Sequence, residues 1–262
     1  MSTFVFEQIG KRPLLRNPVF IEGLPGIGNV GKVAVDFIID EVKAVKLFEI
    51  YSSSFPHSVF VNEDNLVELP KIEIFYKKQK KRDILFLGGD IQPMDEESCY
   101  QFSEQLLDLL QSFKVKEIVT LGGIGLNDIP KRPKVFCTAN SKAALKHYTH
   151  KLLHKKIYGV VGPIVGVSGL LVGLAQKRKI NAASFLAETY GHPMYLGVKG
   201  AREITKILDD IFGLGVTIDK LEKEIDDIES ELLKRTKNLE DVSKQTALHK
   251  LKGKIGEQSY IG

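Results

Sequence analysis

One stretch decides the fold: Val19-Phe20-Ile21-Glu22-Gly23-Leu24-Pro25-Gly26-Ile27-Gly28-Asn29-Val30-Gly31. A short apolar run typical of a β-strand opens onto glycines, and an amphipathic helix follows from Lys32 to about Val42. Strand, turn and helix in this order are typical of an α/β protein. The glycines also match the G-x-G-x-x-G fingerprint of dinucleotide-binding proteins, and Glu49 ends the next strand-like run, where that fingerprint has an acidic residue.

Two interpretations of this glycine turn are open. An additional glycine, Gly23, and Pro25 lengthen the turn between strand and motif, which weakens the dinucleotide interpretation. As a structural element the turn needs no ligand, because glycines admit a tight turn and Asn29 can cap the following helix. We therefore expect a structural turn. The alternative is an anion-binding site at the helix N-terminus, formed by Gly26, Gly28, Asn29 and Gly31.

Strand-like and helix-like segments alternate along the chain. The predicted strands are Val19–Glu22, Val45–Ile50, Ser58–Val61, Leu66–Leu69, Ile72–Tyr76, Ile84–Leu87, Glu117–Leu121, Ile157–Val161 and Ala182–Ala187. The predicted helices are Gly31–Val42, Glu96–Phe113, Ser141–His150, Gly169–Lys177 and Ala201–Phe212. Repeated strand–helix units indicate an α/β fold with a mostly parallel central sheet flanked by helices. Residues 58–69 are typical of a hairpin, so we expect a mixed sheet.

Composition and charge exclude several classes of protein. The 262 residues carry a formal net charge of only +4, with no long basic patch interleaved with aromatic residues, so nucleic-acid binding is unsupported. No apolar run approaches the roughly 20 residues that a membrane helix requires. Two cysteines, Cys99 and Cys137, occur without a secretory signal or a C-x-x-C motif, which indicates a reducing compartment. We expect a cytoplasmic protein without nucleic-acid or membrane partners.

No catalytic, metal-binding or cofactor-binding set is predicted. The run around Ser168 is similar to a nucleophile elbow, but Leu170 breaks the G-x-S-x-G pattern, and Ser168 is interpreted as a helix N-cap. His147, His150 and His154 are spaced along one predicted helical face. Because lysines surround them and no carboxylate or cysteine joins them locally, we interpret them as a solvated face.

The character of the chain changes after residue 213. Apolar residues recur at alternating three- and four-residue steps in a segment dense in charges, namely Ile218, Leu221, Ile225, Ile228, Leu232, Leu239 and Val242. This stripe predicts a long helix whose apolar side packs on the body or on a neighbouring subunit, and we favour the subunit interface. We expect three parts: an α/β domain over 1–213, a C-terminal heptad helix over 214–252 and a flexible tail over 253–262.

An ordered set of segments resembles one family, the PAC2 family of proteasome assembly chaperones, which has many archaeal members. The segments are Glu22–Gly31, Val67–Pro70, Leu85–Pro93, Leu121–Gly123, Gly162–Leu171 and Leu186–Pro193. No single motif is specific, but their order and spacing cover about residues 17–232. The resemblance implies a core similar to nucleoside phosphorylases, no established catalytic residues and a homo-oligomer.

The resemblance also implies a function. Family members related to proteasome chaperones bind the 20S α-ring, some of them through a C-terminal hydrophobic–Tyr–any (HbYX) tripeptide. Here Tyr260 is third from the end and follows Ser259, so the tail is only HbYX-like. We therefore expect a non-enzymatic proteasome assembly chaperone or activator that binds 20S α subunits through Tyr260, Ile261 and Gly262. The alternative is an enzyme or sensor that binds a phosphate-containing small molecule at the strand carboxyl ends.

Overall fold

The computed structural model describes residues 4–62, 64–157, 159, 162–193 and 195–218. Apart from residues 214–218, the predicted heptad helix and the predicted tail lie outside these ranges. Among the described helices, none combines the length and the apolar character needed to cross a membrane.

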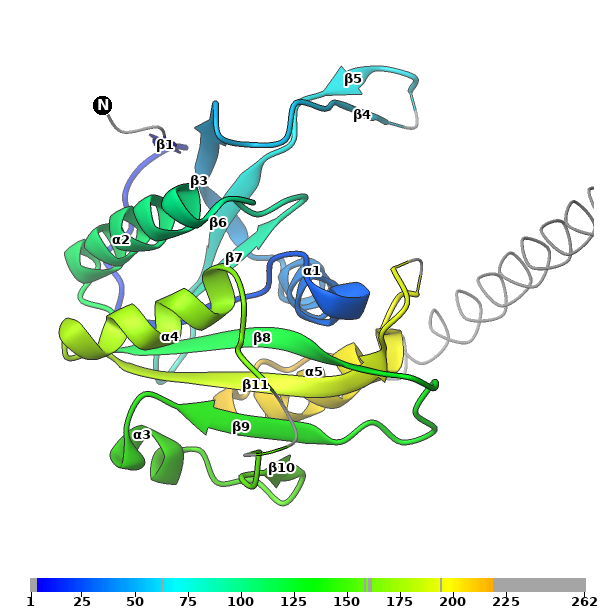
Figure 1. Ribbon diagram of the computed structural model, residues 1–262. Coiled ribbons are helices and arrows are strands. Elements are labelled where there is room, and N and C mark those ends of the chain that lie inside the picture. Colours follow the sequence, from blue (N-terminus) through cyan, green and yellow to red (C-terminus); the bar gives the residue numbers. More distant parts are fainter. Residues whose placement is uncertain (1–3, 63, 158, 160–161, 194, 219–262) are drawn as a thin grey trace, which may run out of the picture. The chain divides into compact units, whose positions relative to one another are not determined.

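The described residues form a nine-stranded mixed sheet and a separate two-stranded hairpin (Figure 1). The strands of the large sheet, in chain order, are β1 (Phe4–Gln8), β2 (Val19–Glu22), β3 (Val45–Ser52), β6 (Ile72–Lys77), β7 (Ile84–Gly89), β8 (Glu117–Leu126), β9 (Val135–Ala139), β10 (Leu153–His154) and β11 (Asn181–Tyr190). Their order in space is β1-β3-β6-β7-β2-β8-β11-β9-β10. Neighbours are parallel through the central strands β7, β2, β8 and β11, whereas β6 on one side and β9 on the other pair with them antiparallel. The predicted mixed sheet with a parallel centre is confirmed.

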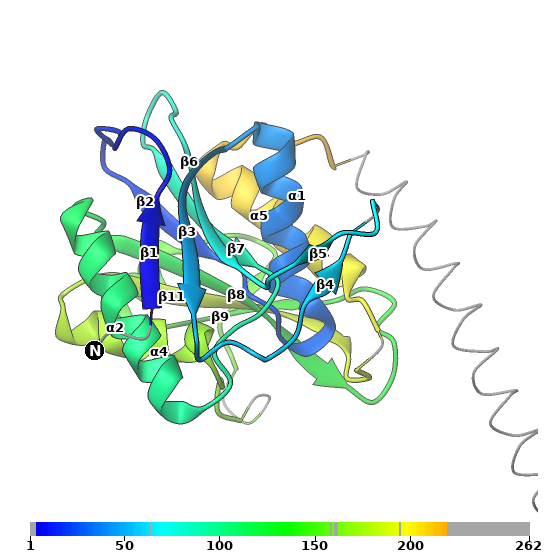
Figure 2. The ribbon, with the colours of Figure 1, turned by 90° about the horizontal axis from the view of Figure 1, so that it is seen from above.

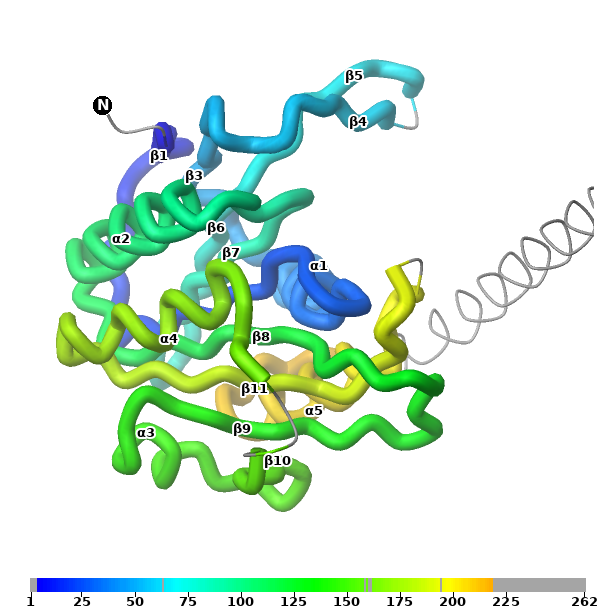
Figure 3. Tube along the Cα trace, viewed as in Figure 1, coloured from blue at the N-terminus to red at the C-terminus, as the bar shows by residue number. Residues whose placement is uncertain are grey.

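Helices cover both faces of this sheet (Figure 2). Helices α1 (Val30–Val42) and α5 (Val198–Phe212) pack against one face, and α2 (Glu96–Ser112) and α4 (Val167–Lys177) pack against the other. The short helix α3 (Lys142–His147) lies beside β9 (Figure 3). Because helices cover both faces, all four residues of β2 are buried. A central strand of this kind is typically a nearly continuous apolar run, and three of the four residues of β2 are apolar.

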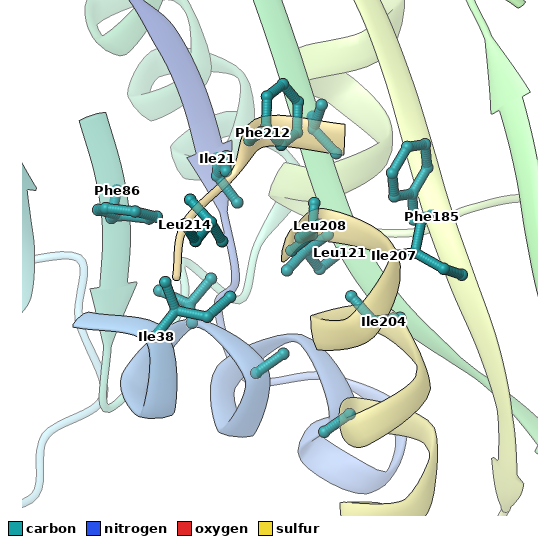
Figure 4. Packing of buried hydrophobic residues seen from close by; sticks show 14 of the residues in the cluster. Ile21, Ile38, Phe86, Leu121, Phe185, Ile204, Ile207, Leu208, Phe212 and Leu214 are labelled. Carbon is teal, nitrogen blue, oxygen red and sulfur yellow. The ribbon is translucent and has the colours of Figure 1, made fainter. Parts of the chain in front are cut away.

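The core under α1 and α5 shows how the sequence pattern becomes packing (Figure 4). Ile204, Ile207 and Leu208 recur at helical spacing and place one apolar face of α5 on the sheet. The left-handed conformation of Gly213 ends α5, and Leu214 and Val216 then return to the same core. Figure 4 shows Ile207 and Leu208 near Leu121 of β8 and Phe185 of β11. Leu214 lies between Ile21 of β2 and Phe86 of β7.

Five segments differ from the prediction. The strands β1, β9 and β10 were not predicted, because each is recognised by its pairing with another strand, namely β3, β11 and β9, rather than by a local pattern. Ile157 and Gly159 are the described residues of the predicted strand Ile157–Val161, and neither lies in a strand. Helix α3 ends at His147 rather than His150 because Tyr148 leaves the helical conformation, is buried, and donates a 2.6 Å hydrogen bond to Glu117 Oε1.

Candidate functional site

The glycine turn packs tightly against the sheet. A side-chain carbon at Gly31 would lie 2.5 Å from the carbonyl oxygen of Leu121, so only glycine allows this approach of α1 to β8. Gly28 has a φ of +61° and lies against Thr189 of β11. At Gly26, by contrast, no atom lies within 4 Å of the position that a side-chain carbon would occupy. Asn29 occupies the N-cap position, but its side chain makes no capping hydrogen bond, so the predicted side-chain cap is wrong. These contacts support the structural interpretation of the turn.

The charges beside this turn oppose a bound anion. The Lys32 ammonium lies 2.9 Å from Asp36 Oδ2, 3.0 Å from the carbonyl oxygen of Gly89 and 3.7 Å from Asp90 Oδ1. The cation in the first turn of α1 is thus compensated by two carboxylates. Helix N-termini bind phosphate through free backbone N–H groups and the helix dipole, and the carboxylates paired with Lys32 weaken the attraction for an anion here.

A buried carboxylate lies at the carboxyl end of β2. Glu22 is fully buried, and its Oε1 accepts hydrogen bonds from the Leu24 backbone N–H at 2.9 Å and from Ser168 Oγ at 3.1 Å. Burial raises the pKa of Glu22 to about 7, although these hydrogen bonds act in the opposite direction. The N-cap of α4 is Gly166, not Ser168. The predicted capping role of Ser168 is therefore wrong, and its hydroxyl instead donates a hydrogen bond to the Glu22 carboxyl group.

Glu22 begins a polar row across three neighbouring strands. It is in register with Thr120 of β8, which is in register with Ser184 of β11. All three residues are buried, and Glu22 Oε2, Thr120 Oγ1 and Ser184 Oγ lack a hydrogen-bond partner among the described residues. The row contains no imidazole, thiol or amine that would activate a hydroxyl as a nucleophile. The sequence analysis missed it, although a carboxylate ending an otherwise apolar strand was a readable signal.

The side chain of Gln92 bridges two segments that follow the strand carboxyl ends. Its Nε2 donates to the carbonyl oxygen of Pro25 at 2.6 Å, and its Oε1 accepts from the Val167 backbone N–H at 3.3 Å. One amide thus joins the glycine turn to the N-terminus of α4. Gln92 and Ser168 thus bond within the chain, whereas the buried polar row keeps three oxygen atoms without a partner among the described residues.

The three spaced histidines do not form one face. His147 Nε2 lies 3.3 Å from Glu117 Oε1, and His150 Nε2 lies 2.9 Å from Asp210 Oδ2. The ring of His154 in β10 contacts that of Phe136 in β9 at a tilted angle. They occupy a helix, a loop and a strand, so the predicted common helical face is wrong. Within the described ranges, no group of three or more His, Cys, Asp or Glu residues is placed to hold a metal ion.

Exposed apolar residues gather on a hairpin formed by β4 (Phe60–Val61) and β5 (Val67–Glu68). This hairpin projects from the large sheet (Figures 1 and 3). Its turn is closed by Asn62, whose Oδ1 accepts from the backbone N–H groups of Asp64 and Leu66 at 3.1 and 2.9 Å. The predicted hairpin is confirmed, but it forms a sheet of its own rather than part of the large one. Its strands are shorter than predicted, two residues each.

A cleft of about 950 Å³ lies at the base of this hairpin. Its lining combines residues of β1, the end of β3 and both arms of the hairpin, including Val5, Tyr51, Phe55, Pro56, Val59 and Leu69. The lining also includes Ser52, Ser53, His57 and Ser58, so apolar and aromatic side chains predominate beside a few polar ones. The predicted partner-binding residues Tyr260, Ile261 and Gly262 lie outside the described residues.

Comparison with known proteins gives a consistent result. A family model described as "PAC2 family" matches residues 20–235. The uncharacterized protein MJ1210 of Methanocaldococcus jannaschii is 27% identical over 228 residues, which are 87% of this chain and 86% of that protein.

Two solved structures from Pyrococcus furiosus are also similar. PbaB, described as an archaeal proteasome activator, has a TM-score of 0.81 and 31% identity, over 90% of this chain and all of that one. PbaA, described as an archaeal homolog of proteasome-assembly chaperone, has a TM-score of 0.71 and 21% identity, over 94% of this chain and 97% of that one.

Proposed function

This chain belongs to the PAC2 family, and from that premise we propose that it is a non-enzymatic proteasome assembly chaperone or activator that binds the α subunits of a 20S proteasome. The observation that carries the proposal is the likeness to PbaB over 90% of this chain at 31% identity. The likeness to PbaA, at 21% identity, supports the fold alone. We therefore favour the activator role over the assembly role.

The absence of catalysis is part of the proposal. At the strand carboxyl ends, Ser168 donates a hydrogen bond to Glu22, and the Gln92 amide bonds to the glycine turn and to the first turn of α4. The Lys32 ammonium is paired with the Asp36 carboxylate. An enzyme using this edge would need a nucleophile, a base and an orienting group within reach of a substrate. The described residues offer one buried carboxyl group with two hydroxyls instead, which supports a binding role.

We propose that the tail makes the contact with the proteasome. Tyr260, Ile261 and the carboxylate of Gly262 would enter a pocket between α subunits at the end of a polar tether. Several tails on one homo-oligomer would raise the apparent affinity without any new contact, because the ring presents repeated pockets. The chain would act in the cytoplasm, in keeping with its two free, buried cysteines.

Hydrolysis of a fluorogenic peptide by purified archaeal 20S proteasome tests the proposal. We expect the rate to rise and saturate as the full chain is added, and to stay near its basal value with a chain that lacks residues 257–262. The full chain must also be recovered with the 20S particle after gel filtration. If the chain is recovered with 20S but hydrolysis does not change, the assembly role replaces the activator role.

A further inference from the structure

The hairpin exposes more apolar surface than its position requires. Six of its side chains have exposed fractions between 45% and 68%, namely Val59, Phe60, Val61, Leu66, Val67 and Leu69. A two-stranded hairpin on its own is marginally stable in water, because neither face is covered. The apolar patches that monomers expose rarely exceed a few hundred Å². A covering partner would explain both the exposure and the persistence of this hairpin.

The apolar side chains are not spread evenly over the two faces. Val61 is in register with Val67, and Phe60 is in register with Glu68. Val59 and Leu69 flank the two strands directly, and the alternation of side chains, continued by one residue, assigns them to the face of the first pair. This aliphatic face (Val59, Val61, Val67 and Leu69) carries no charged residue, whereas the opposite face carries Glu68, whose Oε1 accepts a bond from Asn62.

The aliphatic face continues into the cleft. Val59 and Leu69 belong to the hairpin and also line the cleft, together with Val5, which is 60% exposed on the edge strand β1. One molecule therefore offers an apolar projection beside a recess whose lining is mainly apolar and aromatic, with Ser52, Ser53, His57 and Ser58 among it. A surface with both is self-complementary, as required for an interface in which two copies use the same patch.

We propose that the aliphatic face of the hairpin packs into the cleft at the hairpin base of a second copy of this chain. The inference rests on the homo-oligomer that is part of the proposed function, and it assigns one surface to it, beside the heptad stripe that the sequence places at a subunit interface. Two copies related by a two-fold axis would bury both hairpins at once, since each fills the recess of the other.

The composition of the patch favours a second copy over a transient partner. Interfaces between identical subunits are more apolar than those of partners that associate and dissociate, whose composition is close to that of the ordinary surface. An apolar patch that stays uncovered until a partner arrives is an aggregation liability. A permanent cover removes that liability.

Sedimentation velocity of the full chain tests this interface. The double substitution Val61→Lys and Val67→Lys places two charges on the aliphatic face, and we expect the mass of the oligomer to fall by about half or more. Leu14→Lys is the matched control, because Leu14 is 92% exposed and lies outside the hairpin. Its oligomer should keep the mass of the parent. An unchanged mass in the double variant, or a monomeric parent, overturns the proposal.

A second experiment decides the case if the double variant fails to fold. Chains with Val61→Cys are co-expressed with chains with Val5→Cys, and disulfide formation between them is followed on a non-reducing gel. Cys99 and Cys137 are buried and give little background. We expect a disulfide-linked dimer only when both variants are present, and its absence contradicts the interface.

These outcomes are separable from the proteasome test. An unchanged oligomer that still binds α subunits would overturn the hairpin interface alone. A double variant that dissociates as expected, together with a parent that does not bind α subunits, would leave the interface standing and overturn the proposed function.

Discussion

Ser168 Oγ donates a 3.1 Å hydrogen bond to Glu22 Oε1 and so joins the first turn of α4 to the carboxyl end of β2. The carboxyl group is fully buried, and in the described part of the chain no cation pairs with it. Desolvation therefore dominates and raises the pKa of Glu22 from 4.5 to about 7. The raised pKa of Glu22 makes the free energy of unfolding depend on pH, and the direction of that dependence follows from the direction of the shift.

We expect stability to fall as the pH rises between about 4.5 and about 7. Below that window Glu22 is protonated in both states. Within it, the unfolded chain releases the proton while the folded chain keeps it, so the free energy of unfolding decreases, by up to about 3 kcal/mol. Above it the contribution is constant. Urea unfolding at several pH values measures the effect.

Glu22→Gln is the test variant for this dependence, because its amide stays neutral at every pH. The difference in unfolding free energy between parent and variant should change across the window, whereas Glu96→Gln, at an exposed position of α2, should leave the parent's pH dependence unchanged. Parallel curves for the parent and Glu22→Gln would show that Glu22 titrates normally.

The glycines of the turn should differ sharply in their tolerance of alanine. At Gly31 the new methyl group would meet the Leu121 carbonyl oxygen at 2.5 Å, and we expect a loss of about 1–3 kcal/mol in stability. At Gly26 no atom lies within 4 Å, so Gly26→Ala should be nearly neutral. Thermal unfolding of the two variants compares them directly. Equal losses would mean that the turn is not set by packing against β8.

Nucleotides should not bind at the glycine turn. Its first-turn cation, Lys32, is already held by Asp36 and Asp90, so a phosphate would meet net repulsion. Titration calorimetry with NAD and with ATP should give no dissociation constant in the low micromolar range, which would correspond to about −8 kcal/mol. A constant in that range, abolished by Lys32→Ala, would favour the enzyme or sensor alternative.

The tail should respond to two small changes. Tyr260→Ala removes the aromatic anchor, and one or two residues added after Gly262 move the carboxylate away from its pocket. We expect both to weaken binding to 20S α subunits, and the loss to multiply over the copies in the oligomer. Tyr100→Ala, an exposed tyrosine on α2, is the control. If both tail variants bind as the parent does, a surface of the body makes the contact.

The sequence predicted the elements that alternate clearly between apolar strand and amphipathic helix. The fully apolar β2 and the periodic α5 are examples, because local pattern and final burial agree in them. It did not predict β1 or β9, whose identity depends on strands distant in the chain, β3 and β11. The predicted helix Ser141–His150 was longer than α3, because the hydrogen bond of buried Tyr148 to Glu117 is a tertiary contact that the local sequence does not reveal.

The candidate site was less accessible to sequence analysis than the fold. The roles of Gln92 and Ser168 depend on partners 67 and 146 residues away, and no local pattern specifies such pairs. The aliphatic face of the hairpin was readable in principle, since Val59, Val61, Val67 and Leu69 alternate with other residues. Its exposure was not, because it depends on where the hairpin projects from the body.

The most direct test of the central claim is a pull-down of purified 20S α subunits with the full, C-terminally untagged chain. We predict that the α subunits are retained, and that most of the retained amount is lost when residues 257–262 are removed while circular dichroism and oligomer mass stay constant. Failure of the folded, oligomeric parent to retain any α subunit would contradict the account.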